Sequence, residues 1–291
     1  MKVIVAKRAG FCFGVKRAVD IAFDEARKKK SGVVTLGPII HNPQVVGQLD
    51  RNGVKTIDDI NDINANEAGT VIIRTHGIPV KDMEHLGITG LEVIDATCPF
   101  VKKAQQYAKL LKEEGYKVVI LGDREHPEVK GIMSYAGDHV IVVKDADDYS
   151  PLKGRVGIIV QTTKQVSVLK DLVSIAVEHA LELKVYNTIC NSTALRLKET
   201  EQLAARVDMM LIVGGKNSAN TTRLASFSAS LGVPTRHIET SDEIKDEWFN
   251  GIETVGITAG ASTPDWIIEE VEKRICDIGG SVGDGTGERR T

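Results

Sequence analysis

The stretch LEVIDATCPFVKKAQQYAKLLKEEGYKVVILG, residues 91–122, contains the plan of the fold. A short apolar strand ends just before Cys98, and apolar residues then recur at helical spacing from Pro99 to Gly115. A second apolar strand follows and ends at Gly122, 24 residues beyond the cysteine. Continuous apolar runs without strict alternation are typical of parallel strands that are covered on both faces. The stretch therefore predicts an α/β unit with a cysteine at the start of a helix.

The same order of elements occurs twice more, around Cys12 and Cys190. Each of these cysteines is followed by a segment with helical spacing, GVKRAVDIAFDEARKK after the first and NSTALRLKETEQLAARV after the second. The next apolar strands end at Gly37 and Gly214, which lie 25 and 24 residues beyond their cysteines. A repeat of this length indicates three related α/β units with small parallel sheets.

The third unit lacks a final strand of its own, while the chain opens with one, MKVIVA. We therefore expect this strand to complete the third sheet and to close the units into a pseudo-threefold trefoil around a central site. The predicted division is a first α/β unit over 13–97, a second over 98–189, a third over 190–279 together with strand 1–12, and a flexible tail over 280–291.

Polar side chains recur just beyond the carboxyl ends of two strands in each unit. One set lies 29, 28 and 28 residues after the cysteines, and the other lies 64, 64 and 72 residues after them. Ligands of open α/β sheets bind at this edge, where helix N-termini favour anions. Imidazolium, hydroxyl and amide donors suit phosphate oxygens. We therefore predict a phosphate-binding shell made of His41, His76, His126, Thr162, Ser218, Asn220 and Ser262.

Glu128 lies two residues beyond His126 in this predicted pocket. A glutamate taken alone is usually a solvated surface residue, but a carboxyl group in such a pocket is a natural proton donor. We predict that role for Glu128.

The three repeated cysteines, Cys12, Cys98 and Cys190, suit an iron-sulfur cluster of four irons with one iron free of protein. A helix N-terminus favours each thiolate. Structural zinc is the competing metal, but its ligands usually come in close pairs such as C-x2-C, and the sequence has none. Cys276 lies outside the repeat on an apolar helix face, so we expect it to pack.

Composition excludes several classes of function. The 37 basic and 40 acidic residues give a net charge of -3 without a long block of one sign, so we expect no nucleic-acid partner. No apolar run approaches the length of a membrane span or a secretory signal. We therefore expect a soluble cytoplasmic protein that does not bind membranes.

Eight motifs taken together resemble the LytB/IspH family, the 4-hydroxy-3-methylbut-2-enyl diphosphate reductases. In chain order they are GFCFGV, HNP, THG, DATCP, HPEV, QTT, KNSAN and TAGAS. The resemblance implies a trefoil around an oxygen-sensitive [4Fe-4S] cluster held by Cys12, Cys98 and Cys190. It also implies reductive removal of an allylic hydroxyl to give isopentenyl and dimethylallyl diphosphates, the last step of the methylerythritol phosphate route, with reduced ferredoxin or flavodoxin as electron donor. By the same resemblance, Glu128 is the proton source, and His126 and Thr162 lie with it at the reacting end of the substrate.

One departure from the family is Ala219, which stands between Ser218 and Asn220 where the family often has a second serine. A lost side-chain hydrogen bond there would cost about 0.5 to 1.5 kcal/mol of binding, whereas a backbone contact would be kept. Two other functions remain open from the residues alone. One is a phosphate-binding module with structural zinc, and the other is a cluster enzyme that dehydrates or isomerises its substrate without net reduction.

Overall fold

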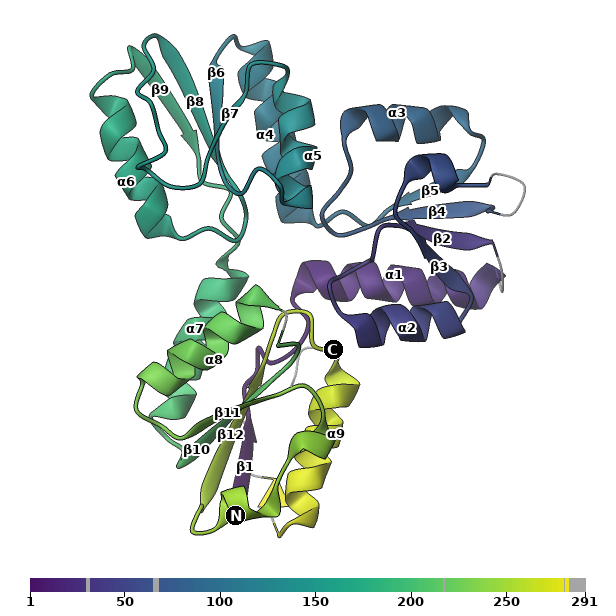
Figure 1. The fold of residues 1–291 in the computed structure, drawn as a ribbon, viewed down its shortest axis with the longest axis vertical. Helices are drawn as coiled ribbons and strands as arrows, with labels where there is room; N and C mark the ends of the chain where they lie inside the picture. Colours follow the sequence, from purple (N-terminus) through teal and green to yellow (C-terminus); the bar gives the residue numbers. More distant parts are fainter. Residues whose placement is uncertain (30–31, 65–67, 217, 280, 283–291) are drawn as a thin grey trace. The chain divides into compact units, whose positions relative to one another are not determined.

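The computed structural model describes residues 1–29, 32–64, 68–216, 218–279 and 281–282. Three separate parallel sheets, each accompanied by helices, account for the strands of this part of the chain (Figure 1). The predicted class, α/β with three small parallel sheets, is confirmed. The trefoil arrangement about a common axis stays a prediction.

The first sheet has the strand order β3-β2-β4-β5, with every neighbouring pair parallel. A helix or a 3-10 helix lies between each pair of successive strands in the chain, as is usual for the crossover between parallel strands. The elements of this region are α1 (Phe13–Lys29), β2 (Val33–Leu36), α2 (Pro43–Arg51), β3 (Val54–Ile57), the 3-10 helix η1 (Ile60–Asp62), β4 (Thr70–Ile73), α3 (Val80–Ile88) and β5 (Glu92–Asp95).

The second sheet has the order β7-β6-β8-β9 and is again parallel throughout. Its longest helix begins with a proline at the first helical position, where the missing N–H costs nothing, and buries a face spaced at three and four residues. The elements are α4 (Pro99–Glu113), β6 (Lys117–Leu121), α5 (Pro127–Ala136), β7 (Ile141–Val143), β8 (Arg155–Val160), α6 (Val166–Val177) and β9 (Glu182–Tyr186).

The third sheet has the order β11-β10-β12-β1-β13. The interior strand β10 is buried along its whole length, as continuous apolar runs predict. The elements are β1 (Lys2–Val5), α7 (Asn191–Ala204), β10 (Met209–Val213), α8 (Ala219–Ser230), β11 (Thr235–Ile238), the 3-10 helices η2 (Ser241–Glu243) and η3 (Asp246–Phe249), β12 (Thr254–Ala259), α9 (Asp265–Asp277) and β13 (Ser281–Val282).

The first strand of the chain lies in the third sheet, where Lys2 pairs with Thr254 and Val5 with Ile257. This confirms the prediction that MKVIVA completes that sheet. The expected tail over 280–291 is wrong for two residues, because Ser281 and Val282 form β13 and pair in parallel with β1. Residues 280 and 283–291 lie outside the described part of the chain.

Contacts along the chain separate it into two compact units. Compact unit 1 comprises 1–16, 41–45 and 191–291, and compact unit 2 comprises 17–40 and 46–190. The third sheet belongs to the first of these, and the other two sheets belong to the second. The predicted division into three α/β domains is not tested by this grouping and stays a prediction.

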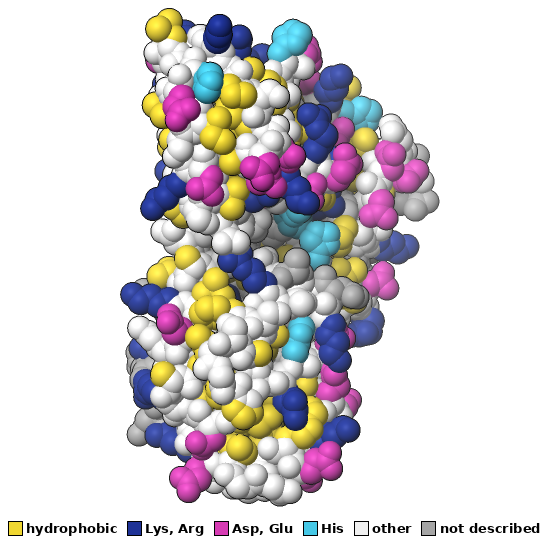
Figure 2. Space-filling model, turned by 60° about the vertical axis from the view of Figure 1, so that its left-hand side comes forward, with side chains coloured by type: hydrophobic (Ala, Val, Ile, Leu, Met, Phe, Trp, Pro, Cys, Tyr) yellow, Lys and Arg dark blue, Asp and Glu magenta, His cyan; other side chains and the backbone are white. Residues whose placement is uncertain are grey.

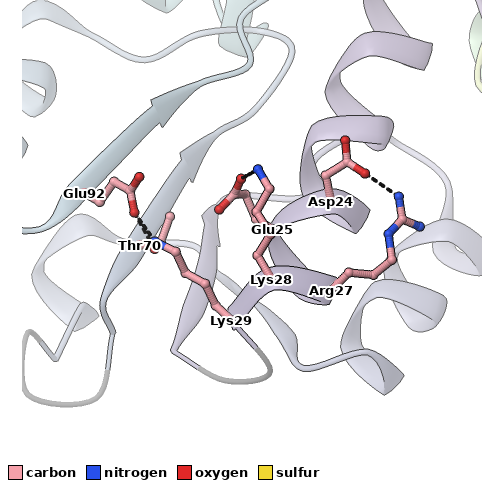
Figure 3. A network of polar contacts seen from close by, with 7 residues as sticks. All are labelled: Asp24, Glu25, Arg27, Lys28, Lys29, Thr70 and Glu92. Atoms are coloured by element: carbon pink, nitrogen blue, oxygen red, sulfur yellow. Dashed lines mark hydrogen bonds and ion pairs between the residues drawn. The ribbon is translucent and has the colours of Figure 1, made fainter.

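Basic residues at the end of α1 bind acidic and hydroxyl partners (Figure 3). Within the helix, Lys28 contacts Glu25 at 2.7 Å, and Arg27 pairs with Asp24. Lys29 leaves the helix to bind the Thr70 hydroxyl at 2.6 Å and the Glu92 carboxylate, both on strands of the first sheet. Exposed ion pairs of this kind contribute little stability each, so their main effect is to fix where the helix ends against β4 and β5.

Charges of both signs are interspersed over the face of the molecule shown in Figure 2. Among the described residues, no helix has the length and the apolar content that crossing a bilayer requires. Cys276 packs against the core formed between α9 and the third sheet, as expected for a cysteine on an apolar helix face.

Candidate active site

The three repeated cysteines share one local setting. Cys12, Cys98 and Cys190 each directly precede a helix, and each is half-buried. Cys98 is the N-cap residue of α4, yet its side chain makes no capping hydrogen bond. Each sulfur therefore lies at a helix start, where the first backbone N–H groups have no partner within the helix.

The backbone beside each cysteine continues the parallel ladder of its sheet. The N–H of Cys98 donates to the Thr75 carbonyl at 2.9 Å, and that of Cys190 donates to the Thr162 carbonyl at 2.8 Å. In compact unit 1, the N–H of Cys12 donates to the Ala261 carbonyl at 3.3 Å. Each acceptor belongs to the polar loop that ends the neighbouring strand. The ladder thus places every cysteine next to a loop that the sequence predicted to bind ligand.

Glu128 is one of the most deeply buried charged residues of the protein, with 2% of its surface exposed. It lies in the first turn of α5, and its carboxylate accepts two hydrogen bonds from Thr162, one from the backbone N–H at 2.7 Å and one from Oγ1 at 2.9 Å. Thr162 is itself buried, just beyond β8. The sequence repeat placed these two residues in one pocket, and the structure brings them into contact.

Two opposing effects act on the proton affinity of Glu128. Burial raises its pKa above the ordinary value of 4.5, because the charged form loses its hydration, and the two bonds from Thr162 oppose that rise. The net direction is upward. A carboxyl group with a raised pKa keeps its proton closer to neutral pH, which is what a proton donor requires.

His126 is the N-cap residue of α5, and its Nδ1 accepts a hydrogen bond from the N–H of Glu128 at 3.2 Å. This contact fixes the imidazole beside the carboxyl-bearing turn. The ring of His76 meets that of His126 edge to face, with centroids 5.3 Å apart. His76, His126, Glu128 and Thr162 therefore form one contiguous group in compact unit 2.

A second group lies in compact unit 1. Asn42 donates through Nδ2 to the Ser262 carbonyl at 2.8 Å, while its Oδ1 accepts from the N–H groups of Gln44 and Val45 and so caps α2. The buried Asn42 thereby ties the loop of the exposed His41 to the loop of Ser262. An asparagine before a proline is a typical start of a helix, so the capping role could have been read from HNP.

Ser218 is the N-cap residue of α8, and its Oγ accepts from the Thr221 hydroxyl at 3.0 Å. Thr263 in turn donates to the Val213 carbonyl at 3.0 Å. These contacts hold the end of β10, the start of α8 and the loop after β12 together. Gly260 allows this close approach, because a Cβ there would lie 2.1 Å from the Thr221 hydroxyl oxygen.

The predicted site residues thus fall into two groups. Compact unit 2 carries His76, Cys98, His126, Glu128, Thr162 and Cys190, and compact unit 1 carries Cys12, His41, Ser218, Asn220 and Ser262. Asn220 is exposed in the first turn of α8. Sequence reasoning missed the supporting residues Thr75, Asn42, Thr221 and Thr263. Within either compact unit, the described residues include no set of three His, Cys, Asp or Glu side chains placed to hold a metal ion.

Comparison with known proteins agrees with the motifs. The family model described as LytB protein matches residues 3–276. The 4-hydroxy-3-methylbut-2-enyl diphosphate reductase of Pelobacter propionicus is 51% identical over 280 residues, which cover 96% of this chain and 99% of the relative. That of Trichlorobacter lovleyi is 50% identical over 283 residues, with 97% and 100% covered.

Two solved structures are also similar. One is an (E)-4-hydroxy-3-methyl-but-2-enyl diphosphate reductase described as the terminal enzyme of the non-mevalonate pathway, with a TM-score of 0.79, 46% identity, and 95% of this chain and 100% of that chain covered. The other is the E-1-hydroxy-2-methyl-but-2-enyl-4-diphosphate reductase of Plasmodium falciparum, with a TM-score of 0.81, 25% identity, and 99% and 93% covered. The resemblance expected from the motifs is confirmed, and the chain belongs to the LytB family.

Proposed function

We infer that this chain is an oxidoreductase that converts 4-hydroxy-3-methylbut-2-enyl diphosphate into isopentenyl and dimethylallyl diphosphates, the last step of the non-mevalonate route. The carrying observation is the match to reductases about half identical over nearly the whole chain. The reaction removes the allylic hydroxyl as water and consumes two electrons and two protons.

We assign the cofactor as a [4Fe-4S] cluster held by Cys12, Cys98 and Cys190. The donor chemistry of these residues fits such a group, because all three are thiols at helix starts and none of the four described cysteines forms a disulfide. Zinc fits less well, since the cysteines come from separate segments without a close pair. When bound, the cluster would supply the electrons and a Lewis-acidic iron.

Glu128 is the proposed proton donor. Its burial keeps a proton available at pH values where an exposed glutamate has lost it, and the two hydrogen bonds from Thr162 hold the carboxyl in one orientation. The departing hydroxyl needs one proton to leave as water, and the carbon skeleton needs another. Protonation at either end of the allylic system accounts for two products.

The remaining polar residues are assigned to the diphosphate. His41, Ser218 and Ser262 come from segments that hydrogen bonds of Asn42, Thr221 and Thr263 hold, and Asn220 lies in the first turn of α8. His76 and His126 supply imidazole N–H groups, and His126 donates through Nε2 because its Nδ1 accepts from the N–H of Glu128. We expect reduced ferredoxin or flavodoxin to deliver the electrons, and the cytoplasm to be the site of action.

The test is an anaerobic preparation of the full chain, analysed for iron and sulfide and then supplied with the hydroxylated allylic diphosphate and a chemical reductant. We expect about four irons per chain, a broad brown absorption, and both diphosphate products formed in step with reductant consumed. A colourless zinc protein would refute the cofactor and the activity. Product formation without consumption of reductant would instead identify a dehydratase or an isomerase.

A further inference from the structure

Arg196 lies on α7 and is buried, with 6% of its surface exposed. Its guanidinium donates hydrogen bonds to three backbone carbonyls. Nη1 binds the carbonyls of Arg8 and, at 2.7 Å, of Ala259, and Nη2 binds that of Gly10 at 2.8 Å. Burying a positive charge destabilises a protein unless hydrogen bonds compensate for the lost hydration. Arginine can bind several carbonyls at once because its guanidinium carries five N–H donors in one plane.

Two of the carbonyls that Arg196 binds, those of Arg8 and Gly10, belong to the loop that carries Cys12, and the third, that of Ala259, ends strand β12. Glu199, one turn further along α7, binds the same loop. Its two carboxylate oxygens accept hydrogen bonds from the N–H groups of Lys7 at 2.8 Å and Arg8 at 2.9 Å. The Arg196 cation thus binds carbonyl oxygens of this loop, and the Glu199 anion binds its N–H groups. The backbone path into Cys12 is therefore fixed by side chains of α7.

This path leaves little freedom at Gly10. Its φ is +89°, and a Cβ there would lie 2.9 Å from Asp265 Oδ1 and 2.9 Å from Ile268 Cδ1 on α9. The loop is thus pressed between α7 and α9, and Cys12 follows two residues later. The guanidinium of Arg196 thus places a buried positive charge against the backbone of this loop.

We propose that Arg196, assisted by Glu199, is a positioning residue for the cofactor, which holds Cys12 in the conformation that binds the cluster and places a buried positive charge beside that ligand. The inference rests on the proposed function, since it needs Cys12 to be a cluster ligand. Burial lowers the pKa of Arg196 to about 10, which still lies well above neutral pH. The guanidinium therefore stays charged at neutral pH.

The test compares four variants of the anaerobically prepared holoenzyme: Arg196→Gln, Arg196→Lys, Glu199→Gln and the control Lys198→Gln, which alters an exposed residue of the same helix. Iron loss to a chelator and the midpoint potential of the cluster are measured for each. Supporting groups around metal ligands typically contribute 10- to 100-fold in metal affinity, so we expect iron to leave about 10- to 100-fold faster after either Arg196 substitution and faster after Glu199→Gln.

The midpoint potentials distinguish an effect of the Arg196 charge on the cluster from a general loss of structure. Arg196→Gln removes a positive charge and should make the potential more negative, Glu199→Gln removes a negative charge and should move it the other way, and Arg196→Lys should release iron faster with a nearly unchanged potential. Unchanged iron loss and potential in folded Arg196→Gln would overturn the inference. If that variant does not fold, unchanged iron loss in Arg196→Lys and Glu199→Gln overturns it. A wild-type protein that binds no cluster would instead refute the proposed function, and the inference with it.

Discussion

Replacing Glu128 by glutamine tests the proton-donor role with little change of shape. The carboxylate accepts from Thr162 N at 2.7 Å and from Thr162 Oγ1 at 2.9 Å. In the amide, Oε1 still accepts from the backbone N–H, and Nε2 can donate to the hydroxyl, which is able to accept. Both contacts persist. At pH values where the carboxyl is protonated, the two proteins should therefore differ in free energy of unfolding by no more than about 1.5 kcal/mol, the scale of one hydrogen bond.

The pH dependence of stability follows from the direction of the pKa shift. Burial raises the pKa of Glu128 in the folded protein above 4.5, so the folded state keeps a proton that the unfolded chain has already lost. The stability associated with the neutral carboxyl is fully present below pH 4.5 and is lost as the pH rises through the raised pKa. Glutamine has no such loss, so its stability relative to wild type should rise by up to about 1.4 kcal/mol per pH unit across that window.

Turnover separates the chemical role from the structural one. We expect Glu128→Gln to keep its iron content and its KM for substrate while kcat falls at least about a hundredfold, because a positioned proton donor typically contributes that much. Glu125→Gln is the matched control, since Glu125 is an exposed glutamate of the same loop. Urea unfolding at several pH values and steady-state kinetics, both anaerobic, measure the two effects. Near-normal turnover, or a stability difference independent of pH, would refute the reasoning.

Three further changes test other parts of the site. Cys98→Ser should abolish a stable cluster, and an unchanged iron content would remove Cys98 as a ligand. Thr162→Val deletes a hydrogen bond that lowers the pKa of Glu128, so the alkaline limb of the pH-rate profile should move to higher pH; a shift the other way contradicts the assignment. Gly214→Ala should lower the free energy of unfolding by roughly 1–3 kcal/mol, because φ at Gly214 is +139° and a Cβ there would lie 2.3 Å from Thr263 Oγ1. The control Gly215→Ala should cost less, since its Cβ would lie 3.9 Å from Glu239 Oε1, and chemical unfolding measures both.

Sequence reasoning found the interior strands with buried apolar runs and also β5, the edge strand before Cys98, but it missed one edge strand in each of the three sheets. VKTI at 54–57, IVV at 141–143 and TRHI at 235–238 occupy the same edge position in the three sheets. Each has three or four residues and a partly exposed pattern, so its local apolar signal is weak. Edge strands bury one side only, and the repeated position was the signal that could have revealed them.

The candidate site was predicted by the repeat rather than by any single residue. The spacing placed Glu128 and Thr162 in one pocket, and the structure adds that they bind each other. Supporting residues escaped prediction because their roles depend on contacts distant in sequence. Arg196 contacts a loop 188 positions earlier, and Asn42 contacts a carbonyl 220 positions later. Nothing in the helical pattern around Arg196 separates it from a solvated arginine.

Thr162 connects the two chemistries proposed for compact unit 2. Its carbonyl accepts from the N–H of Cys190, while its own N–H and hydroxyl donate to Glu128. A displacement of this one peptide would therefore move a cluster ligand and the proton donor together. The neighbouring sheet repeats half of the arrangement, since the Thr75 carbonyl accepts from Cys98 and His76 follows directly. Both contacts continue the pairing of parallel strands, so the position of each cysteine beside a polar loop is a property of the repeated sheet. Glu128 is the feature that distinguishes the second sheet, because it places a proposed proton donor next to that loop.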